Sequence, residues 1–143
     1  MKKGFLAALL VVAFGSAALA DGKNKMLDDL KIALKSSHAV VQTTEFYKKA
    51  SFVFNSKSVN AYFSAEDEEL IGFSVEISSN DLPQGALENI SKKYQGWTIS
   101  DAIMFINADG STAYFARVDN GNHSVALSIS AKGKLSIYAQ MPH

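Results

Sequence analysis

The chain alternates apolar and small polar residues over most of its length, a pattern typical of strands with one buried face. The clearest run has Ile71, Phe73 and Val75 on one side, with glycine, serine and glutamate between and after them. Shorter runs repeat the pattern at these positions: Phe52, Phe54, Ala61, Phe63, Ile103, Phe105, Val125, Leu127, Ile129, Leu135 and Ile137. We therefore expect an antiparallel sheet that is apolar on one face and polar on the other.

Two segments follow a helical period instead. From Met26 to Ser36, apolar residues recur at near-helical spacing among lysines and aspartates, which predicts an amphipathic helix. A second apolar stripe runs from Pro83 to Gln95. It starts at a proline suited to a first helical turn, and it is followed by Gly96, which tolerates the left-handed conformation that ends many helices.

Short turn sequences separate the strands. Asp109-Gly110, Asn120-Gly121 and Lys132-Gly133 each supply a residue that tolerates positive φ, and Ser56-Lys57 and Glu66–Glu68 serve the first half of the chain. Short connections favour pairing between strands that are neighbours in sequence. We expect a series of hairpins.

The two halves of the chain resemble each other. Each has a helical segment followed by several strands, and Val59–Ala65 aligns with Val125–Ala131. We predict an α+β fold built from two tandem helix-plus-antiparallel-sheet repeats, at approximately 24–79 and 82–140. Both helices are expected on one face of the sheet, where the apolar side chains gather.

Composition limits the chemistry. The 143 residues are 48% hydrophobic and 20% charged and include no cysteine, which indicates one globular domain without disulfides, thiol nucleophiles or cysteine zinc ligands. Basic and acidic residues are balanced at 14 each, so no basic excess points to nucleic acid or to an anionic membrane surface. We expect no nucleic-acid partner.

The first twenty residues have the features of an export signal. Lys2 and Lys3 precede an apolar run from Phe5 to Phe14, and Ala18-Leu19-Ala20 presents small residues at the cleavage positions. The apolar run is shorter than the roughly 20 residues that span a bilayer. We predict cleavage after Ala20, a mature domain at 21–143 with no membrane span, and a periplasmic or secreted location.

Several segments carry a family resemblance. They are Phe52-Val53-Phe54, Val59–Phe63, Glu69–Gly72, Asp81-Leu82-Pro83 and Lys93–Trp97. Together they resemble the beta-lactamase-inhibitor-like, PepSY-like family of bacterial periplasmic proteins. The resemblance implies a repeated helix-plus-sheet fold, export, and a binding or inhibitory role without catalytic residues. The inhibitor that gives the family its name grips an enzyme with an aromatic-lined concave sheet.

The sequence contains none of the common hydrolase, metalloprotease or phosphate-loop motifs. His123 follows Asn120-Gly121 and is interpreted as a side chain at the end of a hairpin. The run Glu66–Glu69 is either a solvated turn or a weak cation site, and both alternatives stay open. We expect no catalytic residue, no metal site and no cofactor, although an unrecognised enzyme would need a carboxylate such as Asp101 or Glu76 in a cleft.

The polar face of the predicted sheet collects serines with a few large side chains. We predict that partner-binding residues lie there: Tyr62, Tyr114, Tyr138 and Met104. Tyrosine offers a large amphipathic surface at low entropic cost and serine adapts to it, as in antibody paratopes. The alternative is that exposed strands simply favour serine and tyrosine. Trp97 is interpreted as a plug between the second helix and the following strand.

These features predict an exported, non-catalytic binding module. Its partner is an unidentified protein or peptide, and one form of the function is inhibition of an envelope hydrolase. The alternative is a carrier of a small apolar ligand held between sheet and helices, favoured by these phenylalanines: Phe52, Phe54, Phe63, Phe73, Phe105 and Phe115.

Overall fold

The computed structural model describes residues 25–142. The predicted signal segment at 1–20 and its cleavage site lie outside them. The elements are, in order, α2 (Lys25–Ser36), β1 (Val40–Thr43), β2 (Tyr47–Phe54), β3 (Lys57–Ser64), β4 (Leu70–Glu76), the 3-10 turn η1 (Ser79–Asp81), α3 (Ala86–Lys93), β5 (Thr98–Asn107), β6 (Thr112–Asp119), β7 (His123–Ile129) and β8 (Leu135–Pro142). Neither helix within 25–142 is long and apolar enough to cross a bilayer.

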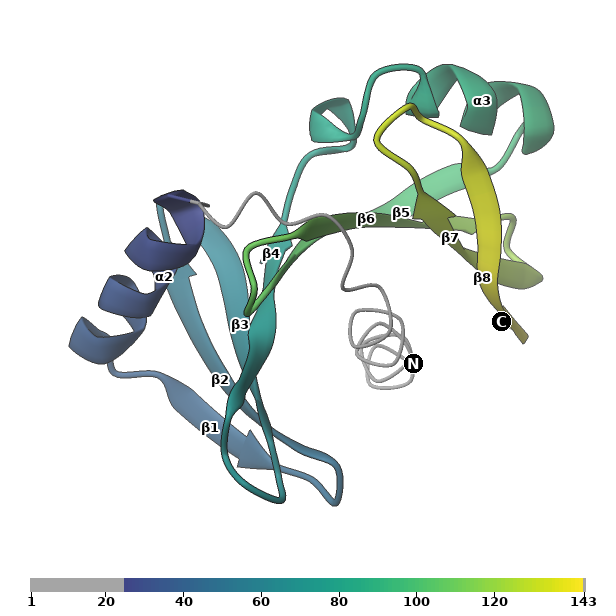
Figure 1. Cartoon of the computed structure of the whole chain (residues 1–143). Coiled ribbons are helices and arrows are strands. Elements are labelled where there is room, and N and C mark those ends of the chain that lie inside the picture. The colour runs from purple at the N-terminus through teal and green to yellow at the C-terminus, as the bar shows by residue number, and fades with distance from the viewer. Residues whose placement is uncertain (1–24, 143) are drawn as a thin grey trace. The chain divides into compact units, whose positions relative to one another are not determined.

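The eight strands form one sheet in the order of the sequence, from β1 to β8 (Figure 1). Hairpin neighbours such as β2 and β3, or β7 and β8, pair antiparallel. The α+β class and the antiparallel sheet are therefore confirmed. The tandem repeat and the placement of both helices on one face stay predictions.

The chain divides into two compact units. The α2 unit contains residues 25–75 together with Phe105–Thr112, and the α3 unit contains Glu76–Met104 together with residues 113–142. This division departs from the predicted repeats at one point, because the tip of the β5–β6 hairpin packs with the α2 unit. Strands β5 and β6 each contribute residues to both units.

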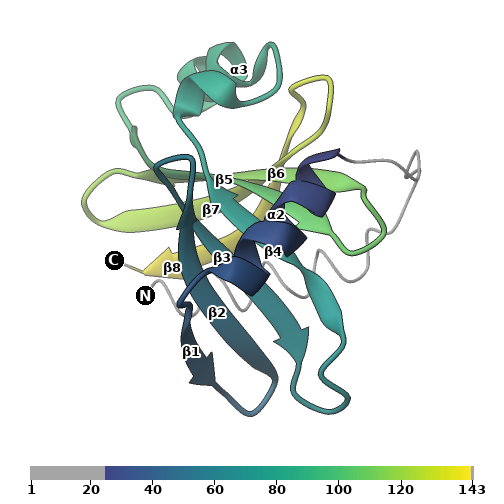
Figure 2. The same ribbon diagram turned by 90° about the vertical axis from the view of Figure 1, so that its left-hand side faces the viewer.

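In the α2 unit, the helix runs beside β2 and buries Leu27 and Leu30 (Figure 2). The sheet contributes Phe73 and Val75, which are fully buried and are paired with small or branched residues of β3. These are the apolar positions that the two-residue period predicts, and the helix spans the range expected from the sequence.

The expectation that the opposite face is solvated is wrong in the α2 unit. Gly72 and Ser74 on β4 are as buried as the apolar residues beside them. The Phe105 ring lies against Gly72, where a Cβ atom would collide with it. Tyr62 packs against Phe105 and Tyr47, with ring centroids 6.1 and 5.3 Å apart. This aromatic cluster covers the face that the alternation assigns to water.

In the α3 unit, Ala86 and Ile90 of α3 belong to one apolar core with three strands. Its strand residues are Ala102, Ala116, Val118, Val125, Leu127 and Ile129. The helix is shorter than the predicted Pro83–Gln95, because Gly85 has a positive φ of 90° and becomes the residue before the first turn. The backbone N–H of Tyr94 then donates to the Ile90 carbonyl and ends the helix.

The predicted turns are mostly confirmed. Gly110, Gly121 and Gly133 all have positive φ between paired strands. The turn between β2 and β3 lies one residue earlier than predicted, because Asn55 and Ser56 adopt the positive φ values. Strand β1 is not predicted by the sequence pattern.

Candidate functional site

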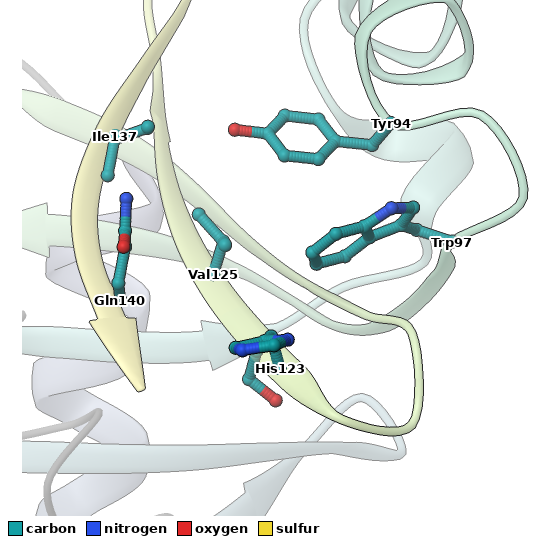
Figure 3. A pocket seen from close by; sticks show the side chains of 7 residues that line it. Tyr94, Trp97, His123, Val125, Ile137 and Gln140 are labelled. Carbon is teal, nitrogen blue, oxygen red and sulfur yellow. The ribbon is translucent and has the colours of Figure 1, made fainter. Parts of the chain in front are cut away.

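A pocket of about 490 Å³ lies in the α3 unit, between the end of α3 and strands β7 and β8 (Figure 3). Two aromatic rings project toward the two strands and form one wall, and aliphatic side chains of the strands form the floor. We call it the Trp97 pocket. Its lining residues are Tyr94, Trp97, His123, Ser124, Val125, Ile137 and Gln140.

The aromatic wall follows from the way in which α3 ends. Tyr94 is the C-cap residue of α3, and Gly96, with a φ of 83°, reverses the direction of the chain. The backbone N–H of Trp97 then donates to the Tyr94 carbonyl at 3.0 Å, which holds the two residues in one tight turn. Their rings meet edge to face, with centroids 5.3 Å apart and planes at 72°. This geometry is favourable for an aromatic pair.

A β-bulge in β8 shapes the floor of the pocket. Val125 pairs with Gln140 and Leu127 pairs with Ile137, so Tyr138 is an extra residue in the register. In a regular strand, Ile137 and Gln140 would point to opposite faces, because side chains alternate. The extra residue places both of them in the Trp97 pocket. Bulges are used in this way to re-aim side chains.

The pocket combines apolar walls with polar groups that have no hydrogen-bond partner in the described part of the chain. Within residues 25–142, no hydrogen bond is made by the Trp97 indole, the His123 ring, the Gln140 amide or the Tyr94 hydroxyl. The Ser124 hydroxyl differs, since it donates to Asp119 at 3.0 Å and is buried. Among the residues that the structure describes, no lysine, arginine, aspartate or glutamate lines the pocket. A neutral, partly aromatic group is the chemistry that such a lining accepts.

The β7–β8 hairpin is fastened to α3 beside the pocket. The Asn89 side-chain N–H₂ donates to the Gly133 carbonyl at 2.9 Å. The hairpin tip approaches the start of α3 so closely that a Cβ on Gly133 would collide with the backbone of Gln84, Gly85 and Ala86. This contact fixes β8 relative to the helix, and therefore fixes the two sides of the pocket.

The predicted binding residues do not share one exposed face. Tyr62 is 1% exposed, so the expectation of an exposed ring is wrong. Tyr114 packs against the core under α3, because it is in phase with Ala116. Met104 is half-buried and shares the parity of the core residue Ala102. Tyr138 is half-buried on the face away from α3, where its ring lies 5.7 Å from Phe115.

The Tyr62 hydroxyl is buried and makes no regular hydrogen bond, either to Ser74 beside it or to any other described residue. Burial raises the pKa of this phenol well above its ordinary value near 10. The neighbouring Ser74 hydroxyl acts in the opposite direction, and Tyr47 adds a smaller upward effect on the pKa. Tyr62 is therefore a neutral core residue at physiological pH.

The carboxylates that an unrecognised enzyme would need do meet in a cleft of about 190 Å³. Both Glu76 and Asp101 line it. The Asp101 carboxylate is ion-paired with Arg117 at 2.9 Å, and the Arg117 Nε–H donates to Ser100 at 3.0 Å. Asp101 is thus engaged by a guanidinium in a partly buried pair, and this pair holds β5 against β6.

The acidic side chains of the turn at Glu66–Glu69 do not converge on one point. Glu68 is ion-paired with Lys48 at 3.0 Å, and Asp67 accepts the backbone N–H of Glu69. Within the described residues, no group of three or more histidines, aspartates or glutamates is placed to hold a metal ion. A similar local bond holds the next acidic turn, where Ser111 donates to Asp109 and lowers the pKa of that carboxyl.

The sequence interpretation missed the Trp97 pocket. Trp97 does pack between helix and strand, as predicted, yet its ring also faces an open cavity. His123 does stand at the end of a hairpin, yet it lines the same cavity. The spacing of Tyr94 and Trp97 around a glycine was the available signal. Gln140 lines the pocket because of the bulge at Tyr138, and no sequence motif predicts that bulge.

Comparison with known proteins identifies the fold. No protein-family model and no curated protein matches the chain. A DUF2874 family protein from Bacteroides uniformis superimposes with a TM-score of 0.65 at 12% identity, covering 84% of this chain and 89% of the other. A protein from Bacteroides eggerthii, provisionally described as periplasmic, gives 0.65 at 13%, covering 87% and 90%.

A third solved structure matches the resemblance noted in the sequence. A BLIP-like protein from Bacteroides fragilis has a TM-score of 0.62 at 19% identity and covers 90% of this chain and 91% of its own. At these identities the similarity shows the fold alone. The chain therefore has a BLIP-like fold, as the sequence segments suggested, whereas the PepSY-like relation stays a prediction.

Proposed function

We propose that this protein is an exported, non-catalytic binding module that holds an apolar or aromatic side chain of a protein or peptide partner in the Trp97 pocket. The observation that carries the proposal is the lining of that pocket. It joins two aromatic rings and two aliphatic side chains to four polar groups that make no hydrogen bond to another described residue. Recognition sites commonly combine an apolar pocket with a few polar groups that fix orientation.

Binding accounts for the site better than catalysis does. Among the described residues that line the pocket, His123 is the side chain whose chemistry best suits a general base. A catalytic histidine needs a neighbour that orients its ring, and the His123 ring has no hydrogen-bond partner within residues 25–142. The BLIP-like and periplasmic descriptions of the structural neighbours are compatible with a binding role. Inhibition of an envelope hydrolase is one form of that role.

The face away from α3 adds a second candidate contact. Tyr138 remains partly accessible there, whereas Tyr62 and Tyr114 are engaged in packing and Met104 is half-buried. We therefore place the principal contact at the Trp97 pocket. Tyr138, on the bulge of the same strand, is the predicted binding residue that stays in the proposal.

Selection from a displayed peptide library tests the proposal. The purified protein is expected to enrich peptides with a recurrent aromatic or large aliphatic residue, and Trp97→Ala is expected to lose that enrichment. Leu87→Ala is the matched control, because Leu87 is a partly exposed apolar residue of α3 outside the pocket. Failure to enrich any peptide, or equal enrichment by Trp97→Ala, would reject a peptide-binding function for the pocket.

A small apolar ligand is the second candidate occupant. The pocket volume of about 490 Å³ falls within the range of small-molecule sites, roughly 300–1,000 Å³. The phenylalanines that suggested a carrier do not line this pocket, and Phe73, Phe105 and Phe115 are fully buried in the core. Solvent extraction of the purified protein followed by mass spectrometry tests whether a small apolar ligand is bound. A stoichiometric ligand that is absent from Trp97→Ala supports a carrier, and an empty wild-type protein excludes a tightly held one.

A further inference from the structure

Strand β8 is the outer strand of the sheet next to the Trp97 pocket. It pairs with β7 on one side and is the last strand in the sheet order. An edge strand presents unpaired backbone N–H and C=O groups along its outer side. With eight residues, β8 is twice as long as β1, the strand at the other edge of the sheet.

Apart from its bulge and Pro142, which both hinder pairing with another chain, this edge has little protection against an added strand. Natural edge strands commonly carry charged residues that prevent pairing with another chain. The sequence of β8 contains no lysine, arginine, aspartate or glutamate. Its bulge at Tyr138 aims Gln140 and Ile137 at the pocket, and regular pairing resumes on both sides of it.

The Trp97 pocket adjoins the strand to which a ninth strand would pair. Ile137 and Gln140 line the pocket and belong to β8 itself, and Ile137 is 52% exposed. An added strand would run about 5 Å from β8, with alternate side chains on the pocket side. One of those side chains would lie beside Ile137, which lies across the pocket from the rings of Tyr94 and Trp97 (Figure 3).

The hairpin before β8 is basic. Lys132 and Lys134 are exposed, and neither forms an ion pair with another described residue. Among the described residues, no lysine, arginine, aspartate or glutamate lines the pocket itself. The complementary segment therefore has a neutral anchor for the pocket and acidic residues at the end that lies beside Leu135.

We propose that β8 captures an extended, acid-flanked segment of a partner protein as an additional strand, with one apolar or aromatic side chain of that segment in the Trp97 pocket. Backbone hydrogen bonds supply affinity in this mode of recognition, and the pocket supplies specificity. The inference rests on the proposed function. A second copy of this chain fits less well, because its own β8 carries no acidic residue to meet the two lysines.

The test uses two synthetic peptides with blocked ends. Both alternate threonine and valine around a central phenylalanine, and an Asp-Glu pair stands at the C-terminus of one and the N-terminus of the other. The two versions cover antiparallel and parallel pairing with β8. Trp97 is the only tryptophan of the chain, so its fluorescence reports binding directly. A matched peptide carries N-methyl groups on alternate residues, which block backbone pairing and keep the side chains.

One peptide is expected to bind and to slow hydrogen exchange of β8 amides. N-methylation is expected to weaken binding at least about tenfold, which corresponds to about 1.4 kcal/mol. The variant Lys132→Glu/Lys134→Glu is expected to weaken it about tenfold at low salt, since reversing two charges turns attraction into repulsion. The control Lys31→Glu/Lys35→Glu makes the same charge change on α2 and is expected to leave binding unchanged.

The outcomes separate this inference from the proposed function. If a peptide changes Trp97 fluorescence while the N-methylated form binds equally and β8 exchange is unaltered, strand addition is wrong and pocket binding stands. If neither these peptides nor any library peptide binds, the proposed function fails as well. Protection of β8 that appears without peptide and rises with protein concentration would identify a second copy as the occupant and overturn the assignment to a foreign segment.

Discussion

At the scale of single residues, the Tyr62 hydroxyl is the clearest defect in the packing. It is buried and makes no hydrogen bond within residues 25–142, whereas its ring packs well against Tyr47 and Phe105. A buried polar group that lacks a partner costs about 1–3 kcal/mol. Tyr62→Phe keeps the ring and removes the hydroxyl. We expect it to raise the free energy of unfolding by about 1 kcal/mol in urea denaturation.

The same hydroxyl makes stability depend on pH in the alkaline range. Because the pKa of Tyr62 is raised in the folded protein, its phenol ionises more easily after unfolding. Its contribution is therefore complete below the ordinary pKa near 10 and is lost as pH rises above that value. The stability gap between Tyr62→Phe and wild type should widen as pH rises from about 9 to about 11. A constant gap would show that Tyr62 is not desolvated.

The position of Tyr62 also shows what alternation predicts and what it leaves open. The period of two assigns Tyr62 and Phe73 to opposite faces, and the structure confirms that assignment. The further step, that the face away from the helix meets water, fails because Phe105 from another hairpin lies over Gly72. That contact joins residues far apart in sequence, so a local pattern contains no trace of it. Tyr114 was misplaced for a simpler reason, since the phase of its strand was not fixed by the sequence.

At the scale of elements, the joint between the β7–β8 hairpin and α3 determines the shape of the candidate site. Gly133 approaches the start of α3 too closely for any side chain, and its φ of 86° favours glycine. Gly133→Ala is therefore expected to cost several kcal/mol, on the order of 2–4, from steric overlap and backbone strain. It should also weaken peptide binding, because β8 must move away from α3.

Asn89→Ala perturbs the same joint between the β7–β8 hairpin and α3, with a smaller expected loss of stability. It removes the hydrogen bond to the Gly133 carbonyl without introducing bulk, so we expect a loss of about 1 kcal/mol. Urea denaturation and the emission maximum of Trp97 measure the two effects separately. An unchanged Trp97 emission in both variants would show that the hairpin joint does not shape the pocket.

Most helices, strands and turns could be predicted from the sequence, and the exceptions are strand β1 and the bulge in β8. The first helix and three glycine turns follow directly from periodicity and from residues that tolerate positive φ. Strand β1 was missed because all four of its residues are exposed and it shows no alternation. The bulge at Tyr138 was missed because it is a property of register between two strands. The pocket depends on that register, so it was out of reach of sequence motifs.

At the scale of the whole molecule, strands β5 and β6 supply residues to both compact units. The two units are therefore connected through the backbone of the same two strands. Phe73 lies in the core of the α2 unit and is fully buried, and a phenylalanine-to-alanine change in a core costs about 3–5 kcal/mol. Trp97 reports on the α3 unit. Because the shared strands cannot unfold in one unit and stay regular in the other, we expect Phe73→Ala to lower the thermal midpoint by roughly 12–20 °C in a single transition. Trp97 fluorescence and far-ultraviolet circular dichroism should give the same midpoint for Phe73→Ala, as they should for Leu127→Ala, its counterpart in the α3 unit. A Trp97 transition that stays at the wild-type temperature in Phe73→Ala would show instead that the two cores melt independently.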